Sequence, residues 1–232
     1  MELNFVQTIA IWALPVIFAI TLHEAAHGYV ARHFGDPTAY LLGRVTLNPL
    51  KHIDLIGTVA VPLGLFLIAK LTGGMGFMFG WAKPVPVNFD QLRRPKQHML
   101  WVAAAGPAMN LLMAIGWALL IRFGATLDGN YFAVPTMLMG TAGLVINVSL
   151  MSLNLLPIPP LDGGRILVSL LPHPLADYVA RLEPYGFMIL LLMISTPLMG
   201  KILQPVISIS LFAIVDLVGI DQRLLNALLS SF

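Results

Sequence analysis

The sequence predicts an all-α polytopic membrane protein with about five to six transmembrane helices and a re-entrant, glycine- and proline-rich segment of partly β-like character. Of its 232 residues, 58% are hydrophobic and only 10% are charged, whereas a soluble domain carries roughly 25% charged residues. Several windows contain no Asp, Glu, Lys or Arg, and the longest reach the ~20 residues that a spanning helix needs. These windows are Leu3–His23, Leu55–Ala69, Met99–Ile121, Gly129–Leu161, Pro184–Gly200 and Ile202–Val215.

The first helix is expected to run from about Phe5 to Phe34. It ends at the sequence Gly35-Asp36-Pro37, because glycine caps a helix and proline forbids its continuation. Glu2 precedes this helix and no basic residue does. We therefore expect the helix to be retained rather than removed as a signal peptide.

The remaining apolar windows predict two further clear spans, followed by a hairpin of shorter helices. The spans cover Met99–Ile121 and Ala133–Leu155, and the C-terminal hairpin covers about 184–219. We expect a single membrane-embedded domain over residues 1–232, with its core at about 5–172.

The stretch between the first two clear spans is irregular. Leu55–Ala69 is short for a span, and glycines and prolines in Gly73–Phe89 disfavour a helix, while alternating valines in Trp81–Phe89 suggest a strand. A strand edge must be shielded from lipid. Basic residues in Gly35–Lys51 and in Lys83–Lys96 place both segments on the cytoplasmic side, so the chain between them is expected to re-enter.

Three titratable residues, His23, Glu24 and His27, lie inside the first apolar helix. The histidines are four residues apart, so they share one helix face and can chelate a single ion. Glu24 follows the first ligand and can take a proton from a metal-bound water, as in the His-Glu-x-x-His arrangement of zinc peptidases. Alternatively, the histidines bond neighbouring helices and Glu24 pairs with Arg32. Ionisable residues in a span are costly, however, which favours the metal site.

A third ligand is expected from Asp162, in the sequence "NLLPIPPLDGG". The prolines break the preceding helix, so a carboxylate can be presented at membrane depth. Together with the histidines it would complete the three-ligand set of a catalytic zinc ion. Alternatively, Asp162 caps a helix over Gly163–Leu171.

Composition excludes several other kinds of protein. A net charge of +2 without a basic patch gives no indication of nucleic-acid binding. The chain has no cysteine, which excludes disulfides, thiolate-bound zinc and iron–sulfur clusters. Any metal must therefore be held by imidazole and carboxylate groups.

"HEAAH" at 23–27 together with "NLLPIPPLDGGRI" at 154–166 resembles the site-2 protease family of intramembrane zinc metallopeptidases. "FGWAKPVPVN" at 79–88 and "AAGPAMN" at 104–110 also resemble segments of this family. The resemblance is to the compact bacterial and archaeal branch that lacks PDZ and CBS domains.

The resemblance implies a role for five residues. His23, His27 and Asp162 match the ligands of one zinc ion per chain, and Glu24 matches the catalytic base. Asn154 matches the residue that stabilises the oxyanion, although it could instead bond a neighbouring helix.

The implied activity is hydrolysis of peptide bonds in or near transmembrane segments of membrane proteins. The resemblance implies that another protease trims the substrate beforehand, and we expect single-pass substrates. We also expect a multi-pass location in the cell membrane, and the basic segments predict an active site nearer the cytoplasmic side. The oligomeric state is left undetermined. Two asparagines on the clearest predicted spans, Asn110 and Asn147, could line a water path or bond neighbouring helices.

Two other functions fit the same polar residues. A metal-ion transporter would use His23, Glu24, His27 and Asp162 as its transport site, although the chain shows no internal repeat. A membrane zinc hydrolase that does not act on peptides would use the same chemistry.

Overall fold

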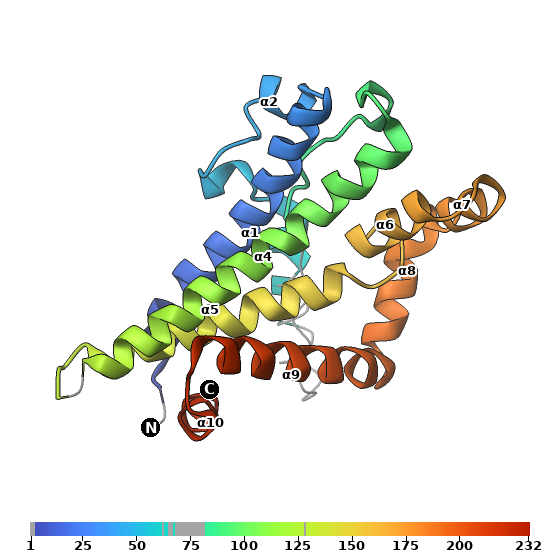
Figure 1. Ribbon diagram of the computed structural model, residues 1–232. Helices are drawn as coiled ribbons and strands as arrows, with labels where there is room; N and C mark the ends of the chain where they lie inside the picture. Colours follow the sequence, from blue (N-terminus) through green and yellow to red (C-terminus); the bar gives the residue numbers. More distant parts are fainter. Residues whose placement is uncertain (1–2, 62, 65–66, 68–81, 128) are drawn as a thin grey trace.

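The computed structural model describes residues 3–61, 63–64, 67, 82–127 and 129–232, and in this part of the chain all regular structure is helical. The elements are α1 Phe5–Phe34, α2 Thr38–Leu41, η1 Pro49–Lys51, η2 Leu55–Ala60, η3 Phe89–Gln91, α4 Pro95–Thr126, α5 Ala133–Asn154, α6 Asp162–Leu170, α7 His173–Ala180, α8 Glu183–Ile194, α9 Leu198–Val218 and α10 Gln222–Leu229. The prediction of an all-α fold is confirmed (Figure 1).

Four helices in the described residues are long and apolar enough to cross a membrane: α1, α4, α5 and α9. The apolar helix α8 is shorter, with 12 residues. The chain is therefore a multi-pass membrane protein, and the described part falls short of the five to six spans expected. Most of the expected re-entrant segment lies outside the described residues. Residues 82–88 form no strand, so the partly β-like character is not found there.

Helix α1 has the predicted bounds, and both of its ends follow from local chemistry. The Asn4 side chain accepts a hydrogen bond from the Gln7 backbone N–H, and the Gln7 side chain accepts one from the Asn4 N–H. This reciprocal pair satisfies two donors that the first turn leaves free. At the other end, Gly35 adopts the left-handed conformation with φ 116°, which glycine reaches without steric cost.

The centre of the fold is formed by α1, α4 and α5, with α9 packed below α5 (Figure 1). Small residues allow α4 and α5 to approach closely, because Gly140 and Gly143 on α5 lie against Trp117 and Ile121 on α4. Small residues serve this purpose in membranes, where helix association depends on van der Waals packing. Arg122 fastens the far end of α4 by donating to the Val218 carbonyl at 2.6 Å.

The two basic segments lie together beside the C-terminal end of α1. The Arg93 N–H donates to the Phe34 carbonyl at 3.1 Å, and the Lys83 N–H donates to the His52 carbonyl at 2.9 Å. Arg44 donates to the Lys83 carbonyl at 2.8 Å. The two basic segments are therefore in contact, as a common location on one side of the membrane would require.

The chain turns sharply between α5 and α6, where prolines end the spanning helix as predicted. Helix α8 packs closely on this turn, because a side chain at Gly186 would overlap the Pro159 carbonyl. Arg165 of α6 also forms an ion pair with Glu183 of α8 at 2.9 Å. Helices α8 and α9 occupy the region of the expected C-terminal hairpin, although α9 runs across the direction of α8 (Figure 1). Helix α9 ends at Gly219, which is left-handed with φ 75°.

Adding one methyl group at Gly143 is expected to destabilise the α4–α5 contact. A Cβ there would overlap the Trp117 indole, and overpacking of this kind costs about 1–3 kcal/mol. Gly143→Ala should therefore lower the thermal midpoint in detergent, followed by circular dichroism. Gly200→Ala is the control, since a Cβ at Gly200 meets no atom within 4 Å. Equal midpoints for the two variants would contradict the expected contact.

Candidate active site

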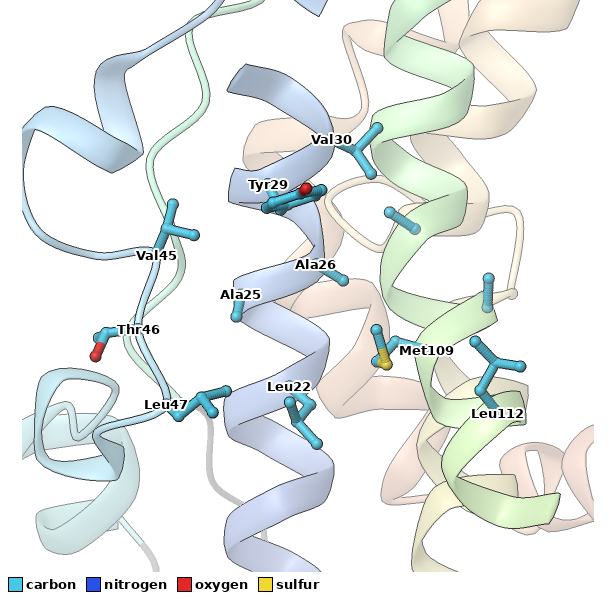
Figure 2. A pocket seen from close by; sticks show the side chains of 12 residues that line it. Leu22, Ala25, Ala26, Tyr29, Val30, Val45, Thr46, Leu47, Met109 and Leu112 are labelled. Carbon is cyan, nitrogen blue, oxygen red and sulfur yellow. The ribbon is translucent and has the colours of Figure 1, made fainter. Parts of the chain in front are cut away.

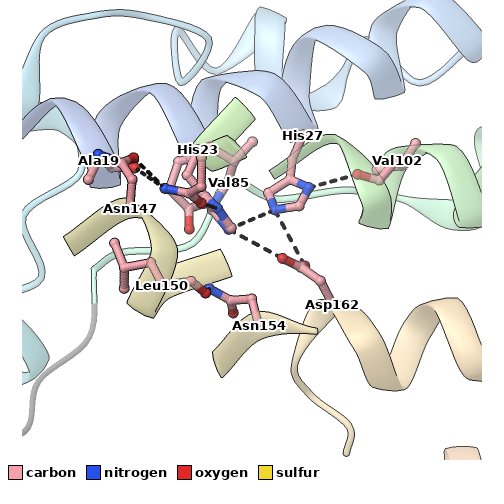
Figure 3. A network of polar contacts seen from close by, with 11 residues as sticks. Ala19, His23, His27, Val85, Val102, Asn147, Leu150, Asn154 and Asp162 are labelled. Atoms are coloured by element: carbon pink, nitrogen blue, oxygen red, sulfur yellow. Dashed lines mark hydrogen bonds and ion pairs between the residues drawn. The ribbon is translucent and has the colours of Figure 1, made fainter. Parts of the chain in front are cut away.

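The side chains of His23, His27 and Asp162 converge on one point (Figure 3). The two Nε2 atoms lie 3.1 Å apart. The Nε2 of His23 lies 3.3 Å from Asp162 Oδ2, and the Nε2 of His27 lies 3.4 Å from Asp162 Oδ1. Both histidines are buried. The structure thus brings together two residues from α1 and one from 135 positions further along the chain, as the sequence predicted.

Hydrogen bonds on the far side of each imidazole determine where its proton lies. The Nδ1 of His27 lies 2.7 Å from the Val102 carbonyl, and the Nδ1 of His23 lies 2.5 Å from Asn110 Oδ1. Both oxygens can only accept, so both Nδ1 atoms carry the proton. In the neutral rings, each Nε2 then directs a lone pair toward the other Nε2 and toward the Asp162 carboxylate.

The amide of Asn110 is itself oriented by a chain of hydrogen bonds. Its Nδ2 donates to Asn147 Oδ1 at 2.9 Å, and Asn147 Nδ2 donates to the Gly143 carbonyl at 2.8 Å. Both asparagines are fully buried. These contacts show interhelical bonding for Asn110 and Asn147, and they extend the support of His23 from α4 to α5.

Asp162 is the first residue of α6, and its side chain makes no capping hydrogen bond. Its Oδ2 atom is buried without a hydrogen-bond partner in the described part of the chain. Gly163 and Gly164 allow the close turn, because a side chain at either position would overlap backbone atoms of residues 155–159. The carboxylate therefore faces the histidines, and the alternative role as a helix cap is not observed.

Gly106 of α4 lies directly against both imidazoles of the centre. A Cβ at this position would overlap the Nε2 atoms of both His23 and His27. Val102, Gly106 and Asn110 are spaced four residues apart, so they share the face of α4 that packs on α1. This spacing was visible in the sequence, although the contact of Gly106 and the carbonyl of Val102 with the histidines was not anticipated.

Glu24 lies beside the centre and contacts the chain preceding α4. The Val85 backbone N–H donates to Glu24 Oε2 at 2.7 Å. The alternative pairing of Glu24 with Arg32 is not observed, and Arg32 instead stacks over the Tyr40 ring at 3.5 Å from its centroid. The carboxylate is thus held by one backbone donor.

Asn154 is the last residue of α5 and is half-buried. Its Nδ2 donates to the Leu150 carbonyl of the same helix at 3.0 Å. It therefore does not bond a neighbouring helix in the described structure. Figure 3 shows it on the same side of α1 as Asp162, at the point where α5 ends.

An apolar groove of about 470 Å³ lies on a different face of α1, between α1, α4 and residues 45–47 (Figure 2). Neither histidine nor Glu24 lines it. It is lined by Leu22, Ala25, Ala26, Tyr29, Val30, Val45, Thr46, Leu47, Ala105, Ala108, Met109 and Leu112. The reactive groups therefore do not open into this groove.

Comparisons with known proteins point to one family. The model of peptidase family M50 matches residues 129–194, which include Asn154 and Asp162. "Putative zinc metalloprotease YwhC" of Bacillus subtilis (strain 168) is 39% identical over 198 residues, covering 84% of each chain. "Putative zinc metalloprotease Rip2" of Mycolicibacterium smegmatis is 30% identical over 201 residues, covering 85% of this chain and 70% of that protein.

The Rip2 protein of Mycobacterium tuberculosis (strain ATCC 25618 / H37Rv) is 30% identical over 224 residues, or 96% of this chain and 78% of that protein. No solved structure matches the chain significantly. The fold and site define a multi-pass membrane protein with a His–His–Asp centre between its helices. The chain belongs to peptidase family M50, the site-2 protease family, which confirms the resemblance found in its motifs.

A methyl group at Gly106 is expected to prevent a metal ion from binding at the centre. The added Cβ would lie 2.4 Å from His27 Nε2 and 2.6 Å from His23 Nε2, within the space that an ion bound to both nitrogens needs. Gly106→Ala purified without chelators should contain far less than one equivalent of metal by atomic emission. Gly116→Ala on the same helix is the control, because no atom lies within 4 Å of its Cβ. A full equivalent of metal in Gly106→Ala would show that the ion does not bind in the space next to Gly106.

Removing the acceptor for His23 is expected to weaken metal binding. Asn110→Leu leaves the His23 Nδ1–H unpaired, and loss of such a supporting group costs about 10- to 100-fold in metal affinity. Asn110→Asp retains an acceptor oxygen and should lose less. Competition with a chelator of known affinity measures both. Equal affinities in the two variants would argue against the orienting hydrogen bond.

Proposed function

We propose that this chain is an intramembrane zinc metalloprotease that hydrolyses peptide bonds in or near transmembrane segments of membrane proteins. The observation that carries the proposal is the convergence of two unprotonated imidazole nitrogens and one carboxylate, next to a glutamate, within a membrane-spanning helix bundle. Membership of the M50 family and the names of the curated relatives support it.

The centre fits one zinc ion. Tetrahedral zinc with ligands at 2.0–2.1 Å requires ligand atoms roughly 3.3 Å apart, and the three contacts here measure 3.1, 3.3 and 3.4 Å. Without a cation, two lone pairs and a carboxylate would repel one another at these distances. The unpartnered Asp162 Oδ2 and the space above Gly106 also suit a bound ion. His23, His27 and Asp162 are the proposed ligands, with one zinc per chain.

Bound zinc supplies Lewis acidity, which polarises a peptide carbonyl and makes a water molecule more acidic. Glu24 is placed to accept the proton of the attacking water and to pass it to the departing amide nitrogen. It follows a ligand in sequence, so it is close to the centre without being one of the three converging groups. We propose Glu24 as the catalytic base.

Asn154 is the proposed oxyanion group. An asparagine side chain has two N–H donors, and one of them is used on the Leu150 carbonyl. The second remains for the oxygen that becomes negative when the carbonyl is attacked. A neutral donor suits this role because it stabilises the developing charge without neutralising the ligands.

The position of the centre along α1 suggests the class of substrate. At 1.5 Å per residue, His27 and His23 lie roughly 10 and 16 Å from the C-terminal end of α1. A peptide bond at this depth is available in a transmembrane segment once its helix unwinds, since helical peptide groups are shielded by their own hydrogen bonds. We propose single-pass membrane proteins as substrates.

The proposed location is the cell membrane, with the active site nearer the cytoplasmic side. The basic segments 35–51 and 83–96 contact each other at the C-terminal end of α1, which is the end closer to the histidines. Positively charged segments are retained on the cytoplasmic side. The position of the histidines along α1 thus indicates both the depth of the centre in the membrane and the side of the membrane to which it is nearer.

Glu24→Gln distinguishes the proposed function from the alternatives. Glutamine keeps an acceptor for the Val85 N–H but cannot take a proton. The variant should retain zinc and lose about 10²- to 10⁴-fold in turnover. Cleavage of a co-expressed single-pass test protein, read as fragments on a gel, measures the effect.

Three outcomes would contradict the proposed protease function or the proposed role of Glu24. Wild-type turnover in Glu24→Gln would exclude Glu24 as the base. Zinc flux into liposomes by the wild type, without cleavage of the test protein, would indicate a transporter. Hydrolysis of small esters or amides, but of no membrane protein, would indicate a hydrolase of another kind.

A further inference from the structure

Residues 82–88 cross the surface of α1 and are fastened to it by backbone N–H groups. Besides the Val85 contact with Glu24 at 2.7 Å, the Asn88 N–H donates to Asp36 Oδ2 at 2.7 Å. The Lys83 N–H is used on the His52 carbonyl at 2.9 Å. Asp36 is fully buried at the end of α1. The segment therefore has a defined register along the helix, with one contact beside the catalytic centre.

Val85 lies between two prolines, so its N–H is the one backbone donor in this short stretch. Pro84 and Pro86 have no backbone N–H, and their rings restrict the backbone on either side. Arg44 holds the carbonyls of Lys83 and Pro84 at 2.8 and 3.3 Å. The Val85 N–H is thus the single backbone donor of residues 84–86, on a stretch with little conformational freedom.

The Val85 side chain is seated on the same face of α1 as Glu24. Gly28 follows Glu24 by four residues, about one turn. A Cβ at Gly28 would lie 3.1 Å from Val85 Cγ1 and 2.7 Å from Val45 Cγ2, and Val85 itself is buried. Because Gly28 has no side chain, the segment can lie directly on α1. This places the Val85 N–H within hydrogen-bond distance of the Glu24 carboxylate.

We infer that the backbone N–H of Val85 is a positioning group for Glu24 in peptide hydrolysis. The contact holds Oε2 and leaves Oε1 to face the attacking water, so the base does not have to be ordered during each turnover. The inference rests on the proposed function, because the position of Glu24 matters only if Glu24 is the base. Val85 acts through Glu24 and is not itself a catalytic residue.

Proline substitution at two neighbouring valines tests the inference. Val85→Pro removes the donor and places a ring carbon against the carboxylate. Val87→Pro is the matched control, because the Val87 N–H donates to no group in the described part of the chain. Val85→Ala keeps the N–H and removes most of the side chain.

The purified full chain is assayed in detergent with a single-pass transmembrane polypeptide that carries an Asn-Pro pair in its apolar segment, and zinc content is measured in parallel. Val85→Pro should retain one zinc and its KM, while kcat falls about 100-fold, as expected for a misplaced catalytic group. Val87→Pro and Val85→Ala should stay close to the wild-type kcat.

Each other outcome overturns the inference. An unchanged or raised kcat in Val85→Pro would show that the contact does not assist Glu24. Equal losses in both proline variants would indicate instead that the segment serves as an edge for an extended substrate. Loss of zinc from folded Val85→Pro would indicate a role in assembling the centre.

Two further comparisons separate misfolding of the variant and failure of the proposed function from failure of the positioning role. If Val85→Pro fails to fold, Gly28→Val takes its place. Its γ-carbons extend beyond a Cβ that already lies 3.1 Å from Val85 Cγ1, so they displace the segment from α1 while the Val85 N–H remains. A wild-type kcat in Gly28→Val overturns the inference. An inactive wild type would overturn the proposed function itself. An active wild type with an active Val85→Pro would overturn the positioning role alone.

Discussion

The structure depends on bringing one carboxylate against two imidazole nitrogens inside an apolar bundle. The three groups approach within 3.1–3.4 Å, and each Nδ1 proton is committed to an oxygen on the opposite side of its ring. Without a positive charge this arrangement would be repulsive, and in a medium of low dielectric the repulsion would be large. The requirement for a cation is therefore built into the hydrogen bonds around the histidines.

The surrounding helices hold the three side chains in place by close packing as well as by hydrogen bonds. Gly106 allows α4 to approach the histidines, and glycines on α5 allow that helix to approach α4. The same close approach lets Asn110 and Asn147 bond each other. Buried amides in a membrane bundle are costly when unpaired, and here each finds a partner across or along a helix. Packing and hydrogen bonding thus support the same geometry.

Glu24, the proposed catalytic base, is supported differently from the histidines. The Glu24 carboxylate is bonded to the backbone N–H of Val85, in the segment 82–88, and not to a side chain on a neighbouring span. Two prolines limit how that segment can move, and Asp36 and Arg44 fasten its ends. Support from the backbone cannot be recognised from residue types, which is why the role of Val85 is absent from any reading of motifs.

The sequence by itself determined the features that arise from local chemistry. The bounds of α1 follow from Asn4, Gln7 and Gly35, and the shared face of His23 and His27 follows from helical periodicity. The break before Asp162 follows from its prolines. Each of these depends on residues a few positions apart, so pattern and spacing are sufficient.

Only the tertiary structure decided which distant groups meet. It placed the two basic segments together, paired Asn110 with Asn147, and showed Gly106 against the imidazoles. It also replaced the expected strand by an extended segment whose N–H groups are bonded to α1 and its neighbours. These contacts join residues tens of positions apart, and their choice depends on how whole helices pack, which no local pattern encodes.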